Sequence, residues 1–342
     1  MMYAYGIRDG GLFTAAGSSA EGELPQAVWI DVIDPTPDED KRLLRRLGVD
    51  IPTQEEMKEI EPSSRLYEEG GALYMTALLT WNADQDPQNT PVAFVITPQH
   101  LVTVRYAEPQ PFRSFIARCT KQPKQITSST LGFIGLTEVI VDRAADLLER
   151  CGAELDAVSA AIFREAPSSK GRHRMRSSEE LETVVRRIGR QYDLASKVRE
   201  SLVSLGRAMA FFRAAASAWI KDDDADARLR AVERDLRALA EHDTYLSQKT
   251  NFLLDATLGL INNDQNKVIK IFSVVAVIFL PPTLVASIYG MNFGIPELKW
   301  SFGYPWSLAL MIVSALAPTG TSSGAAGCEL AAERKANPRY PR

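Results

Sequence analysis

A glycine, a methionine and an asparagine stand together at the end of a long uncharged stretch. No charged side chain occurs in Ile271–Met291, which leads into Tyr289-Gly290-Met291-Asn292-Phe293. An asparagine amide offers a neutral oxygen, and a glycine leaves the neighbouring backbone carbonyls accessible. We therefore interpret this tip as a set of backbone and amide oxygens presented to a species that passes by.

The element that positions this tip reads as a membrane span. A helix needs about 20 apolar residues to cross the hydrocarbon core of a bilayer, and the uncharged stretch has that length. Lys267 and Lys270 precede it, where cationic side chains reach the interface and mark the cytoplasmic side. Pro281 and Pro282 lie inside the span and predict a kink or widening near Thr283.

The span continues a longer helical pattern that begins near Asp226. Apolar residues recur there every three or four positions, with Asp243 and Thr250 in the same seam: Leu229, Val232, Leu236, Leu239, Leu246, Leu253 and Leu260. A heptad-like pattern of this length predicts helix association. One helix from Asp226 to Met291 would extend roughly 100 Å, so it needs partner helices from its own domain and from other subunits.

A second stripe follows the same helix toward the tip. Its members have three-and-four spacing: Asp255, Asn262, Asn266, Ile269, Ser273, Ala276, Leu280, Thr283, Ser287 and Gly290. Around a symmetry axis they would line a pore that is polar below, apolar in the middle and rich in hydroxyls and carbonyls at the outer end. The alternative is plain helix packing, because small residues also let membrane helices approach closely.

Composition narrows the class of protein. The chain has 342 residues, which favours two structural units, and a formal net charge of −4, which gives no reason to expect nucleic acid as a partner. An early Asp9 and the absence of an apolar h-region predict no signal peptide, so the N-terminal part is expected in the cytosol. Cys119, Cys151 and Cys328 lack metal-ligand spacing, and we expect the first two to be buried small hydrophobes.

The N-terminal part alternates strand and helix patterns. Strands are expected at Val28–Ile33, Gly71–Thr80, Pro91–Thr97 and Gln99–Tyr106, the last two joined by a hairpin turn at Pro98-Gln99. Capping patterns at Thr36 and Thr53 predict a helix through Lys41–Leu47, with Leu43, Leu44 and Leu47 on one face, and a short helix at Glu55–Ile60. Longer helices are expected at Phe112–Arg118, at Leu136–Ile162 and from Ser178 to Trp219, with a break at Ala166–Arg174 between the last two.

At its tip the chain resembles the CorA magnesium transporters. The resemblance rests on Gly290-Met291-Asn292 directly after a span, followed by Pro296-Glu297-Leu298, Trp300 and Gly303-Tyr304-Pro305 before a second apolar run. It implies an α+β protein: an N-terminal α/β/α cytosolic domain, a long stalk helix and two C-terminal transmembrane helices. It also implies a homopentamer in the cell inner membrane, multi-pass, with the stalk helix lining the channel.

The resemblance divides the chain into six parts. These are a cytosolic α/β domain with a helical region (1–225), the stalk (226–268), a pore-lining transmembrane helix (269–291), an external loop (292–305), a second transmembrane helix with an atypical end (306–326) and an atypical tail (327–342).

For such a transporter the substrate is Mg²⁺, which sheds its water reluctantly. A ring of Asn292 amides would hold the hydrated ion by outer-sphere hydrogen bonds; the alternative role of Asn292 is a helix C-cap. Glu297 would form a ring of negative charge at the entrance, or be an ordinary solvated loop acid. Ile269, Ser273 and Ala276 are small or apolar, so a gate there would work by dewetting.

The family also carries regulatory cation sites between its cytosolic domains, so Mg²⁺ is expected as substrate and as a candidate regulatory ligand. The candidate acids here are Glu55, Glu56, Glu59, Glu61 and Asp222–Asp226, for which bare surface charge is the preferred interpretation. Co²⁺ and Ni²⁺ are further candidate substrates.

Three alternatives stay open. A zinc-transporting relative of the same fold usually varies the middle residue of the triplet, so Met291 favours magnesium. A membrane-anchored coiled-coil protein without transport would explain the stalk but not Gly290-Met291-Asn292. An enzyme is the weakest alternative, because His100, His173 and His242 are the available histidines and no nucleophile or phosphate-loop spacing occurs.

The expected second span departs from the family. Trp306–Ala317 begins it, but Pro318 and a Thr/Ser/Gly run replace its second half, and a Ser/Gly/Ala tail follows. Shifting the reading frame by one nucleotide between Thr319 and Glu329 allows Arg-Tyr-Phe-Lys-Arg-Arg-Arg-Gly-Leu and a stop. We therefore infer a frameshift near Pro318, in the gene or in its reading.

Overall fold

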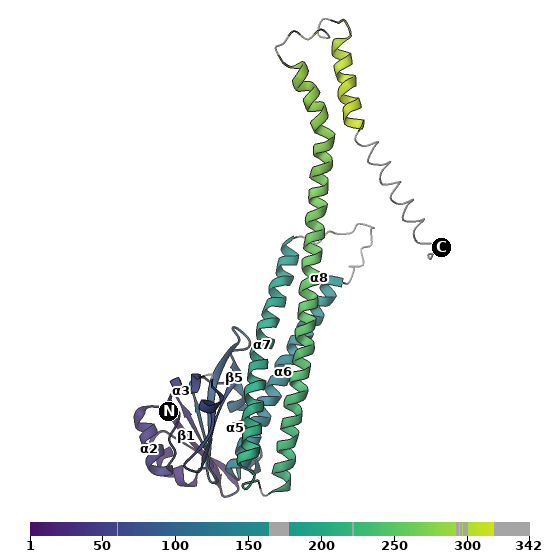
Figure 1. Cartoon of the computed structure of the whole chain (residues 1–342). Helices are drawn as coiled ribbons and strands as arrows, with labels where there is room; N and C mark the ends of the chain where they lie inside the picture. Colours follow the sequence, from purple (N-terminus) through teal and green to yellow (C-terminus); the bar gives the residue numbers. More distant parts are fainter. Residues whose placement is uncertain are drawn as a thin grey trace, which may run out of the picture. The chain divides into compact units, whose positions relative to one another are not determined.

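The structure is a computed structural model that describes residues 1–59, 61–163, 178–220, 222–291, 294, 296 and 300–317 (Figure 1). The chain divides into two compact units, Met1–Thr257 and Leu258–Arg342. The first unit holds a sheet with helices on both of its faces, and the second contains the last part of the long helix α8 and a short helix at Gly303–Ala317.

The described strands of the first unit form a seven-stranded sheet in the order β2-β1-β3-β7-β6-β5-β4. Their bounds are β1 Met2–Arg8, β2 Gly11–Ala16, β3 Trp29–Ile33, β4 Leu66–Glu69, β5 Ala72–Trp81, β6 Gln88–Ile96 and β7 Leu101–Arg105. β3 and β7 pair in parallel, and the other neighbours pair antiparallel. The predicted strands and the Pro98-Gln99 turn are confirmed, since Thr97 N donates to His100 O across it.

The hairpin β1–β2 at the sheet edge was not predicted. Asp9 and Gly10 form its two-residue turn, both with positive φ (53° and 76°). An Asp-Gly pair is a strong sequence signal for this kind of turn, because its backbone twist matches that of the flanking strands. The signal was present in the sequence and could have located both strands.

Short helices cover one face of the sheet. They are α1 (Ser18–Glu23), η1 (Leu24–Gln26), α2 (Pro37–Leu47), α3 (Gln54–Lys58) and α4 (Pro62–Arg65). Leu24, Leu43 and Met57 from this layer are fully buried in one cluster with strand residues such as Ile30 and Val95.

Longer helices cover the opposite face: α5 (Gln110–Lys121), η2 (Pro123–Ile126), α6 (Ser129–Phe163) and α7 (Ser178–Ala215). Aromatic rings join the two layers, as Phe133 of α6 packs on Phe94 of the sheet and on Phe212 of α7, with ring centroids 5.4 and 4.7 Å apart. The predicted α/β/α arrangement is therefore confirmed (Figure 1).

The predicted capping patterns of α2 and α3 are confirmed, but Leu44 does not share the face of α2 that packs on the sheet. Thr36 and Thr53 each accept a hydrogen bond from the backbone of the third helical residue, whose glutamate bonds back to the cap. Leu44 is 49% exposed, whereas Leu43 is fully buried. Successive helical residues are rotated by about 100°, so the buried stripe of α2 runs through Leu43 and Leu47 and leaves Leu44 in solvent. The second capped helix ends at Lys58, and Ile60 lies outside the described residues.

The long helix predicted from Asp226 to Met291 is confirmed as α8 (Asp223–Tyr289), a continuous helix of 67 residues. It begins three residues earlier than predicted because Asp222 accepts a hydrogen bond from the backbone N–H of Asp224. It passes through Pro281 and Pro282 without interruption. The predicted break at Ala166–Arg174 lies outside the described residues.

Candidate functional site

The described members of the predicted pore stripe all lie on α8 or directly at its end. Their spacing keeps them within roughly a third of the helix circumference. Every one of them from Asp255 to Gly290 is exposed on the single chain. Apolar residues on other faces, such as Phe272, Phe279 and Leu284, are equally exposed. Exposure in one chain therefore does not select the face that would line a pore.

The stripe changes character along the helix. Asp255, Asn262 and Asn266 place a carboxylate and two amides at one end. The stripe members that follow are small or apolar: Ile269, Ser273, Ala276 and Leu280. The hydroxyls of Ser273 and Thr283 donate to the carbonyl oxygens of Ile269 and Phe279, at 2.8 and 2.7 Å. Their donors are thus satisfied within the helix, and their oxygen lone pairs remain as acceptors. Acceptor oxygens suit the water molecules around a hydrated cation.

Backbone carbonyls add to these acceptors at the two prolines. A proline has no N–H, so Pro281 and Pro282 leave the carbonyls of Val277 and Ile278 without their usual helical donor. The predicted widening near Thr283 would arise from these two missing bonds.

The end of α8 explains the glycine of the triplet. Gly290 N donates to Ala286 O at 2.9 Å, and a Cβ built on Gly290 would approach that carbonyl oxygen to 3.1 Å. A side chain here would crowd the last turn, so glycine fits the place where the backbone leaves the helix. Tyr289 and Met291 are described on either side of it, whereas Asn292, Phe293 and Glu297 lie outside the described residues.

The cytosolic acids considered for regulation have local structural partners. Glu56 accepts from the backbone N–H of Thr53, Asp222 caps α8, and Asp226 pairs with Arg230 at 3.0 Å. In the described part of the chain, no group of three or more His, Cys, Asp or Glu is placed to hold a metal ion. Within one chain Glu56, Asp222 and Asp226 are therefore explained by helix capping and surface pairing.

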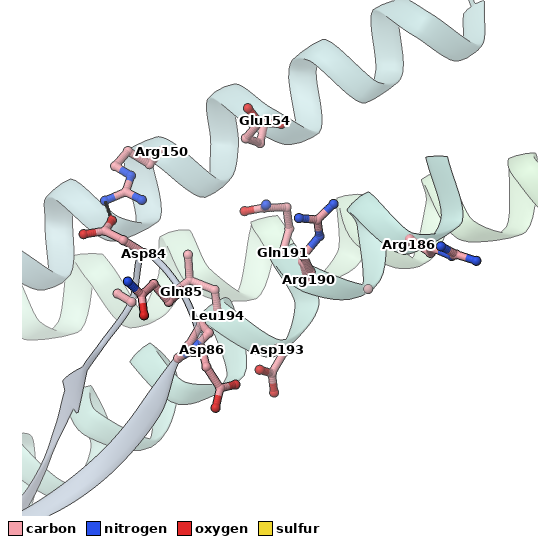
Figure 2. A pocket seen from close by; sticks show the side chains of 13 residues that line it. Asp84, Gln85, Asp86, Arg150, Glu154, Arg186, Arg190, Gln191, Asp193 and Leu194 are labelled. Carbon is pink, nitrogen blue, oxygen red and sulfur yellow. Dashed lines mark ion pairs between the residues drawn. The ribbon is translucent and has the colours of Figure 1, made fainter. Parts of the chain in front are cut away.

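The sequence did not predict a cavity of about 770 Å³ where the β5–β6 turn meets α6 and α7. Its lining alternates carboxylates and guanidiniums, with Arg150 beside Asp84 at 2.7 Å (Figure 2). The charged residues that line it are Asp84, Asp86, Arg150, Glu154, Arg186, Arg190 and Asp193. Such a mixed lining concentrates neither cations nor anions, so it does not resemble an ion site.

The cysteines behave as predicted where the structure describes them. Cys119 and Cys151 are free and buried, and burial raises the pKa of both thiols to about 11. A thiol that stays protonated at neutral pH is a poor nucleophile and a poor metal ligand. Both side chains therefore act as small hydrophobes in the helical layer, and Cys328 lies outside the described residues.

Among the described helices, α8 is the one long and apolar enough to be a candidate membrane span. Its most apolar window has no buried share. The core helix of a soluble protein would be largely buried, so this exposure favours lipid or protein neighbours around the window. The helix Gly303–Ala317 is apolar but shorter, and the rest of the predicted span 306–326 lies outside the described residues.

Comparisons with known proteins concern most of the chain. The model of the family described as CorA-like Mg2+ transporter protein matches residues 25–319. The chain is similar to the magnesium transport protein CorA of Yersinia pseudotuberculosis, with 36% identity over 86% of this chain and 90% of the relative. The protein of the same name from Escherichia coli K12 is also 36% identical, with the same two shares.

A solved structure supports the fold independently. The complete structure of the CorA magnesium transporter from Methanocaldococcus jannaschii superposes with a TM-score of 0.64. The match covers 92% of this chain and 95% of that one, at 17% sequence identity. At this identity the likeness concerns the fold: an α/β unit followed by a long helix.

Proposed function

Since this chain belongs to the CorA-like Mg2+ transporter family, we propose that it is a membrane transporter, not an enzyme, and that it moves Mg²⁺ along a channel lined by α8. The observation that carries the proposal is the uncharged, unburied end of α8, which bears a stripe of oxygen acceptors and leads into Gly290-Met291-Asn292. An apolar helix segment in a soluble core would be buried, whereas this segment is not. Its stripe of oxygen acceptors suits the path of a hydrated ion.

The ion's chemistry determines how the stripe would work. Mg²⁺ binds water tightly, so a path of amide, hydroxyl and carbonyl oxygens can guide the hydrated ion without replacing its ligands. We assign the selectivity step to Asn292, whose amide oxygen accepts hydrogen bonds from coordinated water, in a loop of Tyr289, Gly290, Met291, Asn292 and Phe293. Neutral acceptors release a dication more readily than a ring of carboxylates would.

Enclosing a pore requires more than one copy of α8. The apolar side chains from Ile269 to Leu284 are exposed in the single chain, so neighbouring helices would cover part of them. We propose a homopentamer, in which Asp255 and Asn262 face the axis below the membrane and Glu297 surrounds the entrance. In this arrangement the small and apolar collar around Ser273 and Ala276 would close by dewetting.

The proposed location follows from the helix. Membrane localisation agrees with α8, and Lys267 and Lys270 at the start of the uncharged stretch favour an orientation with the α/β unit in the cytoplasm. We propose the inner membrane and a second crossing that begins at the helix Gly303–Ala317. Co²⁺ and Ni²⁺ are proposed as further substrates, and Mg²⁺ as a regulatory ligand of the cytosolic unit.

Growth rescue tests the transport function directly. A bacterial strain that lacks its own magnesium uptake and needs added Mg²⁺ should grow on low Mg²⁺ when it expresses this chain. Uptake by purified protein in liposomes should then show Mg²⁺ entry, with Zn²⁺ in parallel to test the zinc alternative. A membrane-inserted chain that neither rescues growth nor passes any divalent cation would instead be the coiled-coil anchor without transport.

Subunit number has its own test. Native mass spectrometry of the detergent-solubilised protein should give five copies of the chain. A monomer or dimer that is active in liposomes would refute the pentameric channel while leaving transport intact.

A further inference from the structure

A buried carboxylate interrupts one of the two seams by which α8 packs in the first unit. One seam repeats every seven residues as Val232, Leu239, Leu246 and Leu253. The other runs Leu229, Leu236, Asp243, Thr250 and Thr257, and all five of its members are buried. The Asp243 side chain is 0% exposed.

The polar members of this seam are satisfied in different ways. Thr250 and Thr257 donate to carbonyl oxygens of their own helix, at 2.8 and 2.7 Å. Asp243 accepts from Nε of Arg199 on α7, and its second oxygen, Oδ1, is buried without a hydrogen-bond partner in the described part of the chain. Burial raises the pKa of Asp243, although the hydrogen bond and charge of Arg199 oppose the rise. The carboxylate therefore depends on another helix, and the two threonines do not.

Arg199 lies where α7 is fastened to the sheet. Asn89 of β6 donates to the carbonyl of Lys197 at 3.0 Å and to the carboxylate of Glu200 at 2.8 Å. The backbone N–H of Leu78 in β5 donates to Ser204 Oγ at 2.9 Å. The guanidinium of Arg199 also donates to Ser247 on α8, at 3.0 Å. Polar bonds thus run from the sheet through this segment of α7 to α8.

We propose that Arg199 and Asp243 form a register pin that fixes the axial position of α8 against α7 and, through α7, against the sheet. The apolar seam of Val232, Leu239, Leu246 and Leu253 does not by itself define a register, because a shift by one heptad places an apolar residue again opposite the same neighbours. A shifted Asp243 would bury its carboxylate away from Arg199, which is strongly unfavourable.

Other ion pairs also join α8 to the neighbouring helices, but they do not fix its register in the same way. Arg228 binds Glu138 of α6 through two nitrogens at the beginning of the helix. Lys249 pairs with the exposed Asp156 of α6 at 2.6 Å. Arg213 and Glu233 also join α7 to α8, but both side chains are partly exposed and can follow a small displacement through solvent. Asp243 is the fully buried partner among these charged pairs.

Spin labels on α7 and α8 can measure the register in the full-length protein. Tyr192 on α7 and Ala238 on α8 are exposed and would each be replaced by Cys, with Cys328→Ser as background and Cys119 and Cys151 protected by burial. Co-expression with an excess of chains that lack the two new cysteines leaves one labelled pair in each assembly. With Arg199 and Asp243 intact, the two labels at positions 192 and 238 should give a single narrow distance.

Asp243→Leu should give a second or broadened distance between the labels, displaced by about 10 Å, which corresponds to one heptad of α8. Its thermal midpoint should stay within about 5 °C of the parent, because the side chain of Arg199 is 46% exposed and can be solvated when the buried carboxylate is replaced by an apolar group. The control Glu233→Gln, which breaks the partly exposed pair between the same two helices, should keep the single distance.

A single narrow distance in Asp243→Leu would overturn the proposal, whether or not its midpoint falls. If Asp243→Leu does not fold, the same distance is measured in Asp243→Asn, because the amide keeps the shape of the carboxylate and removes its charge. A broadened distance in Asp243→Asn supports the pin, and an unchanged one refutes it.

Discussion

The two units of this chain differ in which side chains they bury. In the first unit a charged pair is buried: Asp31 and Arg105 lie in the sheet, 2.9 Å apart at their closest atoms, with Thr103 donating to the same carboxylate. In the second unit apolar rings such as Phe272 and Phe279 are exposed. The change occurs within a single helix, since the last buried residue of α8 is Thr257.

The difference indicates what each unit needs to be stable. The first unit completes its core within one chain, so its fold depends on packing inside that chain. The second unit leaves its apolar side chains exposed, so it requires apolar neighbours, from lipid or from protein, to cover them. Substitutions in the first unit should therefore change stability, and substitutions at the end of α8 should change transport at nearly constant stability.

The largest expected effect is the loss of transport in Asn292→Ala. If the amide replaces bulk water around the hydrated ion, its removal should abolish Mg²⁺ uptake in liposomes. Thermal midpoint and subunit number should stay as in the parent, because position 292 lies outside the first unit, Met1–Thr257. Normal uptake by a correctly assembled variant would remove Asn292 from the selectivity step and break the proposed division between the units.

Arg105→Met tests whether substitutions in the first unit change stability. The substitution leaves Asp31 buried without its charge partner and removes the guanidinium that lies 4.6 Å from the ring centre of Phe112. Breaking a buried pair in this way costs about 3–5 kcal/mol, or about 10 °C in the thermal midpoint of a unit of this size. The same substitution at Arg150, whose pair with Asp84 is exposed, should cost at most about 1 kcal/mol. Equal losses in the two variants would contradict the role assigned to burial.

Sequence reasoning reached the long-range features of α8 because they repeat. Leu229, Leu236 and Leu253 follow helical spacing, and the structure buries all three. It missed the β1–β2 hairpin, whose Asp9-Gly10 turn is a local signal that does not repeat. It also missed the cavity, which forms from segments far apart in the chain. Asp243 was recognised as a seam residue, but its partner Arg199 is set by the packing of α7, which periodicity does not specify.

The candidate site was predicted less completely than the fold. The stripe from Asp255 to Ser287 lies on one helix as expected, but the pore itself would form between copies of the chain. The roles of Asn292 and Glu297 came from the resemblance of the loop to a family, because a triplet of residues carries little physical information without its neighbours. These roles stay predictions.

Glu297→Gln should have a smaller effect on transport than loss of Asn292. A ring of carboxylates at the entrance raises the local cation concentration through a field that salt screens. The uptake rate should therefore fall several-fold at low ionic strength and little at high ionic strength, with the thermal midpoint unchanged. Rates equal to those of the parent at both salt concentrations would leave Glu297 as an ordinary loop acid.

The smallest expected effect concerns the capping box of α2 in the first unit. Glu39 accepts from the backbone N–H of Thr36 at 3.0 Å. Burial alone would raise the pKa of Glu39, but the hydrogen bonds from Thr36 and from the amino group of Met1 lower it overall. A carboxyl group whose pKa is lowered on folding stabilises the fold above its ordinary pKa and loses this contribution as the pH falls through the lowered value.

Glu39→Gln should therefore destabilise the first unit by about 1 kcal/mol at pH 7, which corresponds to roughly 2–4 °C in the thermal midpoint. The difference from the parent should shrink as the pH falls through the lowered pKa of Glu39, where the carboxyl group of the parent also becomes neutral. Asp38→Asn is the matched control, since it removes the same charge from the first turn of α2 without touching the capping bonds. Its effect should be a few tenths of a kcal/mol, from the helix dipole alone. Uptake should be unchanged in both variants; a loss of transport in Glu39→Gln at full stability would show that the first unit controls the ion path through this helix, and the separation between the two units would fail.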